Sequence, residues 1–358
     1  MSTSVSPRVG IPQFELTIGK AAIAPALKAD ISAVEVTEDI DMPSMLSFTV
    51  NLWDAARQSL KESYFTQFAL GTPLELAVGI SGTSPIFTGE VTALEPEFGG
   101  IDRGDSLKIQ AYNRLHRLQF GTHQRTFEKM AYSDVASSIA DELGLSSAVD
   151  NTTVKHAHVA QRNVSNLRFL LDLARPINYE LRVEDKTLYF RKTQEQQGAA
   201  VSLTYRRDLI EFTPRQRVVP EGAKVEVRGW DVKTKKLILG KAGSGDETSK
   251  MGGKKTGAEI AASAFTSFTS ATRTITRQPI VDADEATQIA KAYYNRQQRD
   301  FIEAQAECAG SPMIRAASTV DISGVGDAFS GTYSVVSATH RVGPEGYRTR
   351  FKATRNSV

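Results

Sequence analysis

The sequence contains a single cysteine, Cys308, among its 358 residues. One thiol cannot form an internal disulfide framework, and it cannot supply the several thiolates of a structural zinc cluster. No apolar run approaches the roughly 20 residues that a transmembrane helix needs. The first twelve residues lack the apolar centre of a secretory signal peptide. These absences predict a protein that is made in the cytoplasm and that has no stable membrane insertion.

The chain also has little excess charge of either sign, because its formal net charge at pH 7 is +2. The charges are nevertheless unevenly spread: residues 1–100 carry a net charge of −7, residues 101–200 carry +2, and residues 201–358 carry +7. Such asymmetry bears on partners and assembly rather than on the fold. The basic residues lack the interleaved aromatic residues of single-strand nucleic-acid binders, so we expect no nucleic-acid specificity.

Short alternating runs predict antiparallel β-strands at both ends of the chain, around a middle segment with helical spacing. Each β part contains about six strands and predicts a small β-barrel or sandwich. We expect a flexible arm over residues 1–12, a first β domain over 13–127 and a compact α+β domain over 128–198. A second β domain follows over 199–358.

Four local patterns add three helices and a loop to this prediction. Residues 55–65 have helical spacing and no β-branched residue, which predicts a short helix. Ser165 is a candidate N-cap for a helix that stops before Pro176, and Asp282 or Asp284 can cap a helix over 284–298. Residues 240–257 are rich in Gly, Ser and Lys, which predicts a mobile loop.

The last part of the sequence predicts a β-hairpin. Alternating runs at 332–341 and 347–354 flank the turn sequence Gly-Pro-Glu-Gly at 343–346. Because successive side chains of a strand point to opposite faces, the second run has one face for burial and one basic face. The buried face would contain Tyr347, Thr349, Phe351 and Ala353, and the basic face would contain Arg348, Arg350 and Lys352.

This hairpin also resembles a known motif. The residues that carry the resemblance are Gly331, Tyr333, Val335, His340, Gly346, Tyr347, Thr349 and Phe351. Their order is similar to the closing motif of the phage late control D family, the central hub proteins of contractile tail baseplates. Those proteins are in turn similar to the N-terminal hub region of VgrG spikes. Weaker matches at residues 133–135, 158–161, 166–170 and 188–190 extend the resemblance over nearly the whole chain.

The resemblance implies a fold and a function. The fold would be mainly β, with two small antiparallel, tail-tube-like β-barrels separated by the compact α+β domain. The protein would be a homotrimer that adapts a six-fold tube to a three-fold spike, in a virion tail or an extracellular injection particle. Its partners would be an inner tube protein, other baseplate proteins and a separate spike protein. A separate spike is expected because VgrG chains continue into a neck and needle, whereas this sequence stops at Val358.

The sequence offers little that could perform catalysis. His156 and His158 would share one face of a strand, but no third metal ligand is near them in sequence. A hydrogen-bonded structural role is expected for His340. We therefore expect no enzyme activity, no catalytic or metal-binding residue and no cofactor. The alternative function is a cell-wall glycan-binding or hydrolytic module that uses the middle domain.

The uneven charge suggests how copies of the chain would assemble. If the acidic first β domain meets the basic second one around a ring, opposite potentials would favour the correct order. In the rival hypothesis, the basic faces line the channel or meet the spike, and the acidic face meets the tube. The candidate interface residues are Glu35, Glu38, Asp39 and Asp41 on the acidic side, and Arg206, Arg207, Arg348, Arg350 and Lys352 on the basic side. The acidic run at 38–41 is expected to be a solvated loop.

Overall fold

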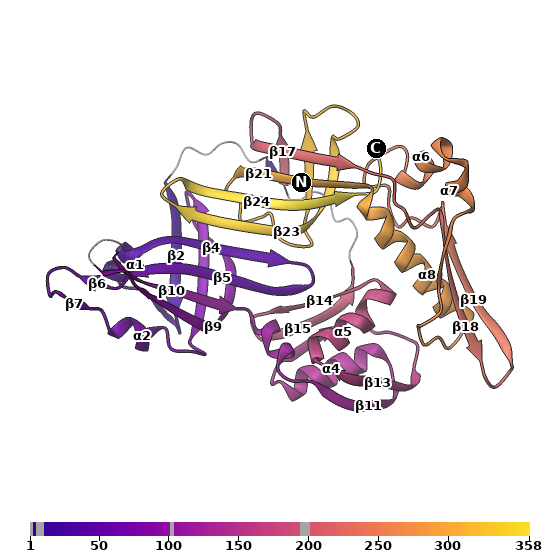
Figure 1. Ribbon diagram of the computed structural model, residues 1–358, viewed down its shortest axis with the longest axis horizontal. Coiled ribbons are helices and arrows are strands. Elements are labelled where there is room, and N and C mark those ends of the chain that lie inside the picture. Colours follow the sequence, from indigo (N-terminus) through magenta and orange to yellow (C-terminus); the bar gives the residue numbers. More distant parts are fainter. Residues whose placement is uncertain (1–2, 5–10, 101–103, 194–200) are drawn as a thin grey trace.

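The computed structural model describes residues 3–4, 11–100, 104–193 and 201–358. These residues form three units in sequence order: a first β unit, a middle α+β domain and a second β unit. Figure 1 shows the first unit in indigo to purple at the left and the middle domain in magenta below. The second unit, in salmon to yellow, lies above and to the right. Within the expected arm, Thr3–Ser4 form strand β1, which pairs in parallel with β16, and residues 1–2 and 5–10 lie outside the described range.

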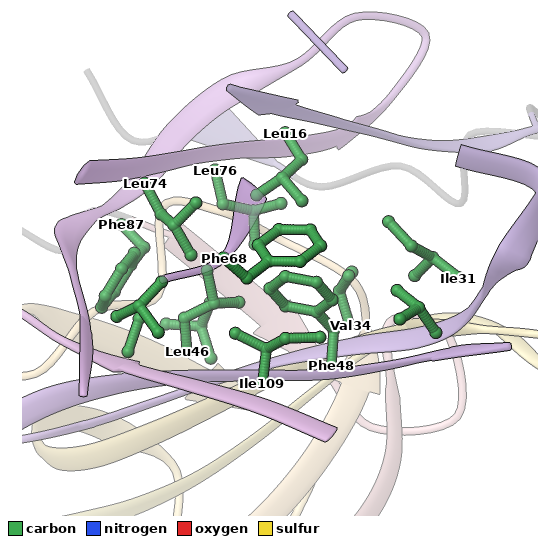
Figure 2. Packing of buried hydrophobic residues seen from close by; sticks show 14 of the residues in the cluster. Leu16, Ile31, Val34, Leu46, Phe48, Phe68, Leu74, Leu76, Phe87 and Ile109 are labelled. Atoms are coloured by element: carbon green, nitrogen blue, oxygen red, sulfur yellow. The ribbon is translucent and has the colours of Figure 1, made fainter. Parts of the chain in front are cut away.

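The first unit is an antiparallel sheet whose alternating strands bury every second side chain. Its elements are β2 (Pro12–Ile18), β3 (Ala21–Ala22), α1 (Pro25–Asp30), β4 (Ile31–Asp39), β5 (Met42–Asn51), β6 (Trp53–Asp54), β7 (Ser59–Leu60), α2 (Ser63–Gln67), β8 (Pro73–Ile80), β9 (Ser84–Phe98) and β10 (Asp105–Tyr112). Figure 2 shows the core, where Leu46, Phe48 and Ile109 lie opposite Leu16 and Leu76. The rings of Phe48 and Phe68 meet edge to face with centroids 5.4 Å apart, so the loop after α2 closes the core.

The helix expected over residues 55–65 was wrong. The Asp54 carboxylate accepts hydrogen bonds from the backbone N–H groups of Ala56 and Arg57, which makes a tight turn. Gln58 then adopts a left-handed backbone conformation with φ of 50°, which a right-handed helix does not allow. The chain therefore forms the small hairpin β6–β7, and only the short helix α2 follows it.

The middle domain packs helices against small sheets. Its elements are η1 (Arg114–Gln119), β11 (His123–Met130), α4 (Tyr132–Glu142), β12 (Ser146–Val149), β13 (His156–Val164), α5 (Asn166–Ala174), η2 (Arg175–Ile177), β14 (Tyr179–Glu184) and β15 (Thr187–Lys192). The predicted cap of α5 is confirmed, because Ser165 Oγ accepts a hydrogen bond from the backbone N–H of Arg168 at 3.3 Å. Apolar faces of α4 and α5 share one core with strands β14 and β15, so the domain has its own hydrophobic centre.

The second unit contains two hydrophobic cores, one formed mostly by strands and one formed where a three-stranded sheet packs against helices. Its strands are β16 (Val201–Thr204), β17 (Leu209–Gln216), β18 (Lys224–Asp231), β19 (Lys236–Gly243), β20 (Thr272–Ile275), β21 (Ile302–Ala309), β22 (Thr319–Ser323), β23 (Gly331–Gly343) and β24 (Gly346–Arg355). Its helices are α6 (Gly257–Ala264), α7 (Thr266–Ser270), α8 (Ala283–Gln298) and η3 (Arg299–Phe301). Asp282 caps α8 as predicted, by accepting a hydrogen bond from the backbone N–H of Glu285. Gly240 lets α8 approach β19, because a Cβ there would lie 2.1 Å from the Ala286 carbonyl carbon.

The segment expected to be a mobile loop has a defined path. Residues 240–243 belong to β19, and the strand therefore extends further than the composition suggested. Beyond it, the backbone N–H of Thr248 donates to the Asn295 side chain, and the N–H of Lys254 donates to the carbonyl of Val358. These bonds attach the segment to α8 and to residues 356–358. Its mobility stays a prediction for limited proteolysis.

Strands of both β units belong to one sheet, in which most neighbouring strands are antiparallel, rather than to two separate barrels. Fourteen of the described strands pair in it, along the path β1–β16–β22–β23–β4–β5–β10–β9–β8–β2–β3, with β24, β21 and β17 branching from β23. The fold is therefore mainly β with an α+β insert, as predicted. The described pairings do not close this path into a ring of strands, so the two predicted β-barrels are not confirmed. The register between β23 and β4, with Val342 opposite Val34, joins the two units.

Candidate functional site

The closing hairpin β23–β24 is the structural centre of the chain. Near its turn, Val342 and Tyr347 pack into the core of the first unit. Near its open end, Tyr333, Val335 and Phe351 pack into the core of the second unit. One hairpin therefore contributes to two hydrophobic cores, which fixes the two β units relative to each other (Figure 1).

His340 lies at the point where the hairpin passes from one core to the other. Its side chain is buried, and Nδ1 lies 2.9 Å from Tyr347 Oη and 3.1 Å from Thr349 Oγ1. Thr349 Oγ1 also accepts a hydrogen bond from the backbone N–H of Ser311. Burial, and secondarily the positive charge of Arg315, lower the pKa of His340 to about 4. His340 is therefore neutral at pH 7 and has the structural role expected from the sequence.

Two glycines allow large side chains to reach the hairpin. A Cβ at Gly310 would lie 2.0 Å from Cγ of Tyr347, so that ring packs directly on the backbone. At Gly331, φ is 136° and a Cβ would lie 2.6 Å from a guanidinium nitrogen of Arg355. Arg355 is buried, and its guanidinium carbon lies 5.6 Å from the centroid of the Tyr333 ring. Gly331, Tyr333 and Tyr347 of the motif therefore take part in packing.

The acidic candidates are engaged within the chain. Glu38 is buried and makes a bidentate ion pair with Arg315, whose Nε lies 2.7 Å from Oε2. Asp41 Oδ2 accepts a hydrogen bond from Arg175 Nη2 at 2.9 Å. The expectation that residues 38–41 form a solvated loop was thus wrong for Glu38 and Asp39, which end strand β4, and an arginine 277 positions away covers Glu38.

The remaining acidic candidates are less buried. The Glu35 carboxylate lies 3.9 Å from Arg341 Nη1 on the neighbouring strand, and Asp39 Oδ1 accepts a hydrogen bond from the backbone N–H of Asp41. Neither arrangement removes the side chain from solvent completely.

The basic candidates are more accessible than the acidic ones. Arg206 lies over the ring of Tyr205, and Arg207 Nη2 lies 2.9 Å from Asp208 Oδ2. On β24, Arg350 Nε donates to Glu307 at 2.6 Å while most of its side chain stays exposed. Lys352 is exposed on the same face, and Arg348 is half-buried there. The predicted alternation of a buried and a basic face on this strand is confirmed, and its role as an interface stays a prediction.

A cavity of about 1220 Å³ lies where the three units meet. The first unit lines it with residues 38–42 and 85–88, the middle domain with 178–185, and the second unit with 303–305 and 334–336. Ion pairs cross this junction from Arg315 to Glu38 and from Arg175 to Asp41. The cavity is therefore bridged by charge pairs between units, which the sequence could not show because the partners are far apart along the chain.

A second buried contact joins the middle domain to α8. The rings of Tyr132 and His156 stack with centroids 4.2 Å apart, and His156 Nε2 lies 3.3 Å from Glu285 Oε1. Burial lowers the pKa of His156 and raises the pKa of Glu285. His158, by contrast, is exposed. Among the described residues, no group of three or more His, Cys, Asp or Glu side chains could hold a metal ion.

No helix formed by the described residues is both long enough and apolar enough to cross a bilayer.

A comparison with known protein families identifies the family of this chain. A family model described as the Alg8 N-terminal domain matches residues 11–343. The chain belongs to the Alg8 N-terminal domain family. This description names no reaction, ligand or partner, and no curated protein matches the sequence.

Solved structures similar to this Alg8 N-terminal domain family member include two tail proteins. One is the 43 kDa tail protein of prophage MuSo2 from Shewanella oneidensis, with 11% identity, a TM-score of 0.69, and coverage of 96% of this chain and 98% of that protein. The other is a tail protein from Neisseria meningitidis MC58, with 9% identity, a TM-score of 0.67, and coverage of 96% of each chain.

A third similar structure comes from a secretion system. It is an E. coli component of the type VI secretion system, described as structurally similar to the T4 bacteriophage tail proteins gp27 and gp5. Identity is 12%, the TM-score is 0.59, and the match covers 96% of this chain and 77% of that one. At such identities the likeness concerns the fold. The sequence resemblance to tail and baseplate proteins is thus confirmed for the fold, while membership of the late control D family is not.

Proposed function

We propose that this member of the Alg8 N-terminal domain family is the structural hub of a contractile tail or injection-system baseplate, of the late control D type. It would act as a homotrimer that adapts a six-fold tube to a three-fold spike. The observation that supports this most is the extent of the fold match, which covers 96% of this chain and 98% of a prophage tail protein. A match over both β units and the α+β domain indicates a shared arrangement, whereas a shared single domain would match only in part.

The hairpin β23–β24 supplies the rigidity that such an adaptor needs. Because its side chains pack into both β cores, the two β units of one chain keep a fixed relation. Three copies around an axis would then present six β units at fixed positions. A six-fold tube protein could contact these six units, while a separate spike protein would follow the three-fold symmetry of the copies.

A non-enzymatic role fits the charges at the central cavity. Hydrolysis of a glycan by two carboxyl groups needs both side chains free to exchange protons or to attack. The Glu38 and Asp41 carboxylates on the cavity wall are instead held by Arg315 and Arg175. The wall also carries Glu180 and Asp300, whose pKa values burial raises, so the charges alone do not decide against a hydrolase. We favour structural partners over the alternative of a glycan-binding or hydrolytic module because the fold match extends over the whole chain. The protein would be made in the cytoplasm and become part of a virion tail or extracellular particle, with other baseplate proteins as neighbours.

Mass measurement of the native protein tests the proposal. The purified chain, alone or mixed with candidate tube and spike proteins, should contain three copies per particle. A chain that stays monomeric in every mixture would contradict the hub proposal. Sedimentation with peptidoglycan provides the opposing test, since saturable binding by a monomer would support the glycan-binding alternative.

A further inference from the structure

Arginines from two units meet at one corner of the central cavity. Arg175 begins η2 in the middle domain, Arg296 lies in the last turn of α8, and Arg299 follows at the start of η3. All three side chains line the cavity, and α8 packs directly against η2. Because residues three apart lie on the same side of a helix, Arg296 and Arg299 reach the cavity together, beside Arg175.

Two of these guanidinium groups have donors that the protein leaves unused. Arg175 donates from Nη2 to Asp41 Oδ2 at 2.9 Å, while its Nε is buried without a hydrogen-bond partner. The Arg296 side chain has no hydrogen bond or ion pair with any residue of the described ranges, and it keeps access to solvent. A buried donor without an acceptor costs free energy, so an acceptor placed between the two arginines would stabilise this corner.

The positive charge at this corner is only partly balanced. Partial burial lowers the pKa of Arg296, the carboxylate of Asp41 opposes that shift, and the charge of Arg175 adds to it. Asp41 is therefore the one anion that acts on both arginines among the groups that shift this pKa and pair with Arg175. Asp300, the next acidic side chain, already lies 3.4 Å from Arg217. A further negative charge would be attracted to this corner.

The donors define the chemistry of a ligand. The planar fork of a guanidinium group matches the paired oxygens of a carboxylate or a phosphate group, and it donates two parallel hydrogen bonds to either. A cavity of about 1220 Å³ exceeds the size of one small ion, so the acidic group of a larger molecule would also fit.

We propose that this corner binds an oxyanion, a phosphate or carboxylate group, held by Arg175 and Arg296. The bound group would join the middle domain to the second unit, next to Asp41 of the first unit. It would therefore stabilise the junction of the three units. Such a clamp does not require the hub function proposed above.

Calorimetric titration of the full chain with inorganic phosphate, and separately with sodium acetate, tests the site. At constant ionic strength, at least one of the two should bind saturably and raise the melting temperature, because a ligand that binds only the folded chain stabilises it. Arg296→Gln should weaken this binding by about tenfold or more, since it removes a pair of charge-assisted hydrogen bonds.

Asp41→Asn should produce the opposite change. It removes the carboxylate that competes with the ligand for Arg175, so the oxyanion should bind several-fold more tightly. A variant that is damaged in its fold would not bind a ligand more tightly, so this result cannot come from partial unfolding.

Two variants serve as controls. Arg168→Gln removes the same charge from α5, where Arg168 is exposed and is not among the described residues that line the cavity. It should bind the oxyanion as the unmodified chain does. Arg296→Lys keeps the charge and loses the planar fork, so its affinity should lie between those of the unmodified chain and Arg296→Gln.

The two probes also distinguish the possible ligands. Binding of phosphate alone would assign the corner to phosphate groups, and binding of acetate alone would assign it to carboxylates such as the end of a peptide chain. The oxyanion site would be overturned if neither probe bound saturably below about 10 mM. Binding that is insensitive to both Arg296→Gln and Asp41→Asn would overturn it as well. Both results would leave the hub proposal standing, because that proposal is tested by the number of copies per particle.

Discussion

Replacing His340 should change how stability depends on pH. The folded chain holds this side chain neutral, with a pKa of about 4 against an ordinary value of 6.5. Between these values the unfolded chain takes up a proton that the folded chain does not, so the free energy of unfolding falls as pH falls. The contribution of neutral His340 to the free energy of unfolding is complete above about pH 6.5 and is lost by about pH 4. The gap between the two pKa values corresponds to about 3 kcal/mol.

Urea unfolding of the wild type and of His340→Gln, measured every half unit from pH 4 to pH 7.5, isolates this contribution. Glutamine does not titrate, and its amide can still meet Tyr347 and Thr349. Other groups, including His156, titrate in both proteins and cancel in the difference. The wild type should lose stability more steeply than the variant, by up to about 1.4 kcal/mol for each pH unit. Parallel curves would refute the assignment of a neutral, buried His340.

Three further predictions concern named contacts. Arg315→Ala should destabilise the chain by about 3 kcal/mol in urea unfolding, because it leaves the Glu38 carboxylate buried without its partner. The double variant Arg315→Ala with Glu38→Gln should recover part of that loss. Gly310→Ala should cost about 1–3 kcal/mol by forcing the Tyr347 ring off the backbone, whereas Gly326→Ala, which meets no atom within 4 Å, should show only the backbone strain of its φ of 81°. Burial raises the pKa of Cys308 to about 12, so a thiol reagent at pH 8 should label it only when the chain unfolds, and rapid labelling of the native protein would contradict its position in the core.

Local pattern sufficed to predict the closing hairpin and its two faces. Tyr347, Thr349 and Phe351 alternate with charged residues. When only one face of a strand is buried, this alternation decides which side chains point into the core. The caps at Ser165 and Asp282 were likewise predictable, because a cap bonds within three residues. Such features depend on neighbours in sequence.

Contacts between segments that are far apart in the sequence could not be predicted from local patterns. Nothing near Glu38 indicates Arg315, and nothing near His156 indicates Glu285 on α8. The failed helix at 55–65 shows a local limit as well, since the Asp54 side chain competes for the backbone N–H groups that a helix would need. The pairing of β23 with β4 required the register of two strands about 300 residues apart, which alternation alone does not specify.

The pairing of β23 with β4 also determines the order in which parts of the chain can fold during synthesis. The first unit receives Val342 and Tyr347 into its core, so its β4 edge and part of its interior stay uncovered until the ribosome has released the hairpin. Contacts of such long sequence separation carry a large loop-closure cost and form slowly. The middle domain, whose core uses residues 115–190, can fold in the meantime. The nascent first unit therefore keeps an unpaired strand edge until the hairpin is made, the period in which a chaperone or a neighbouring polysome chain would find it.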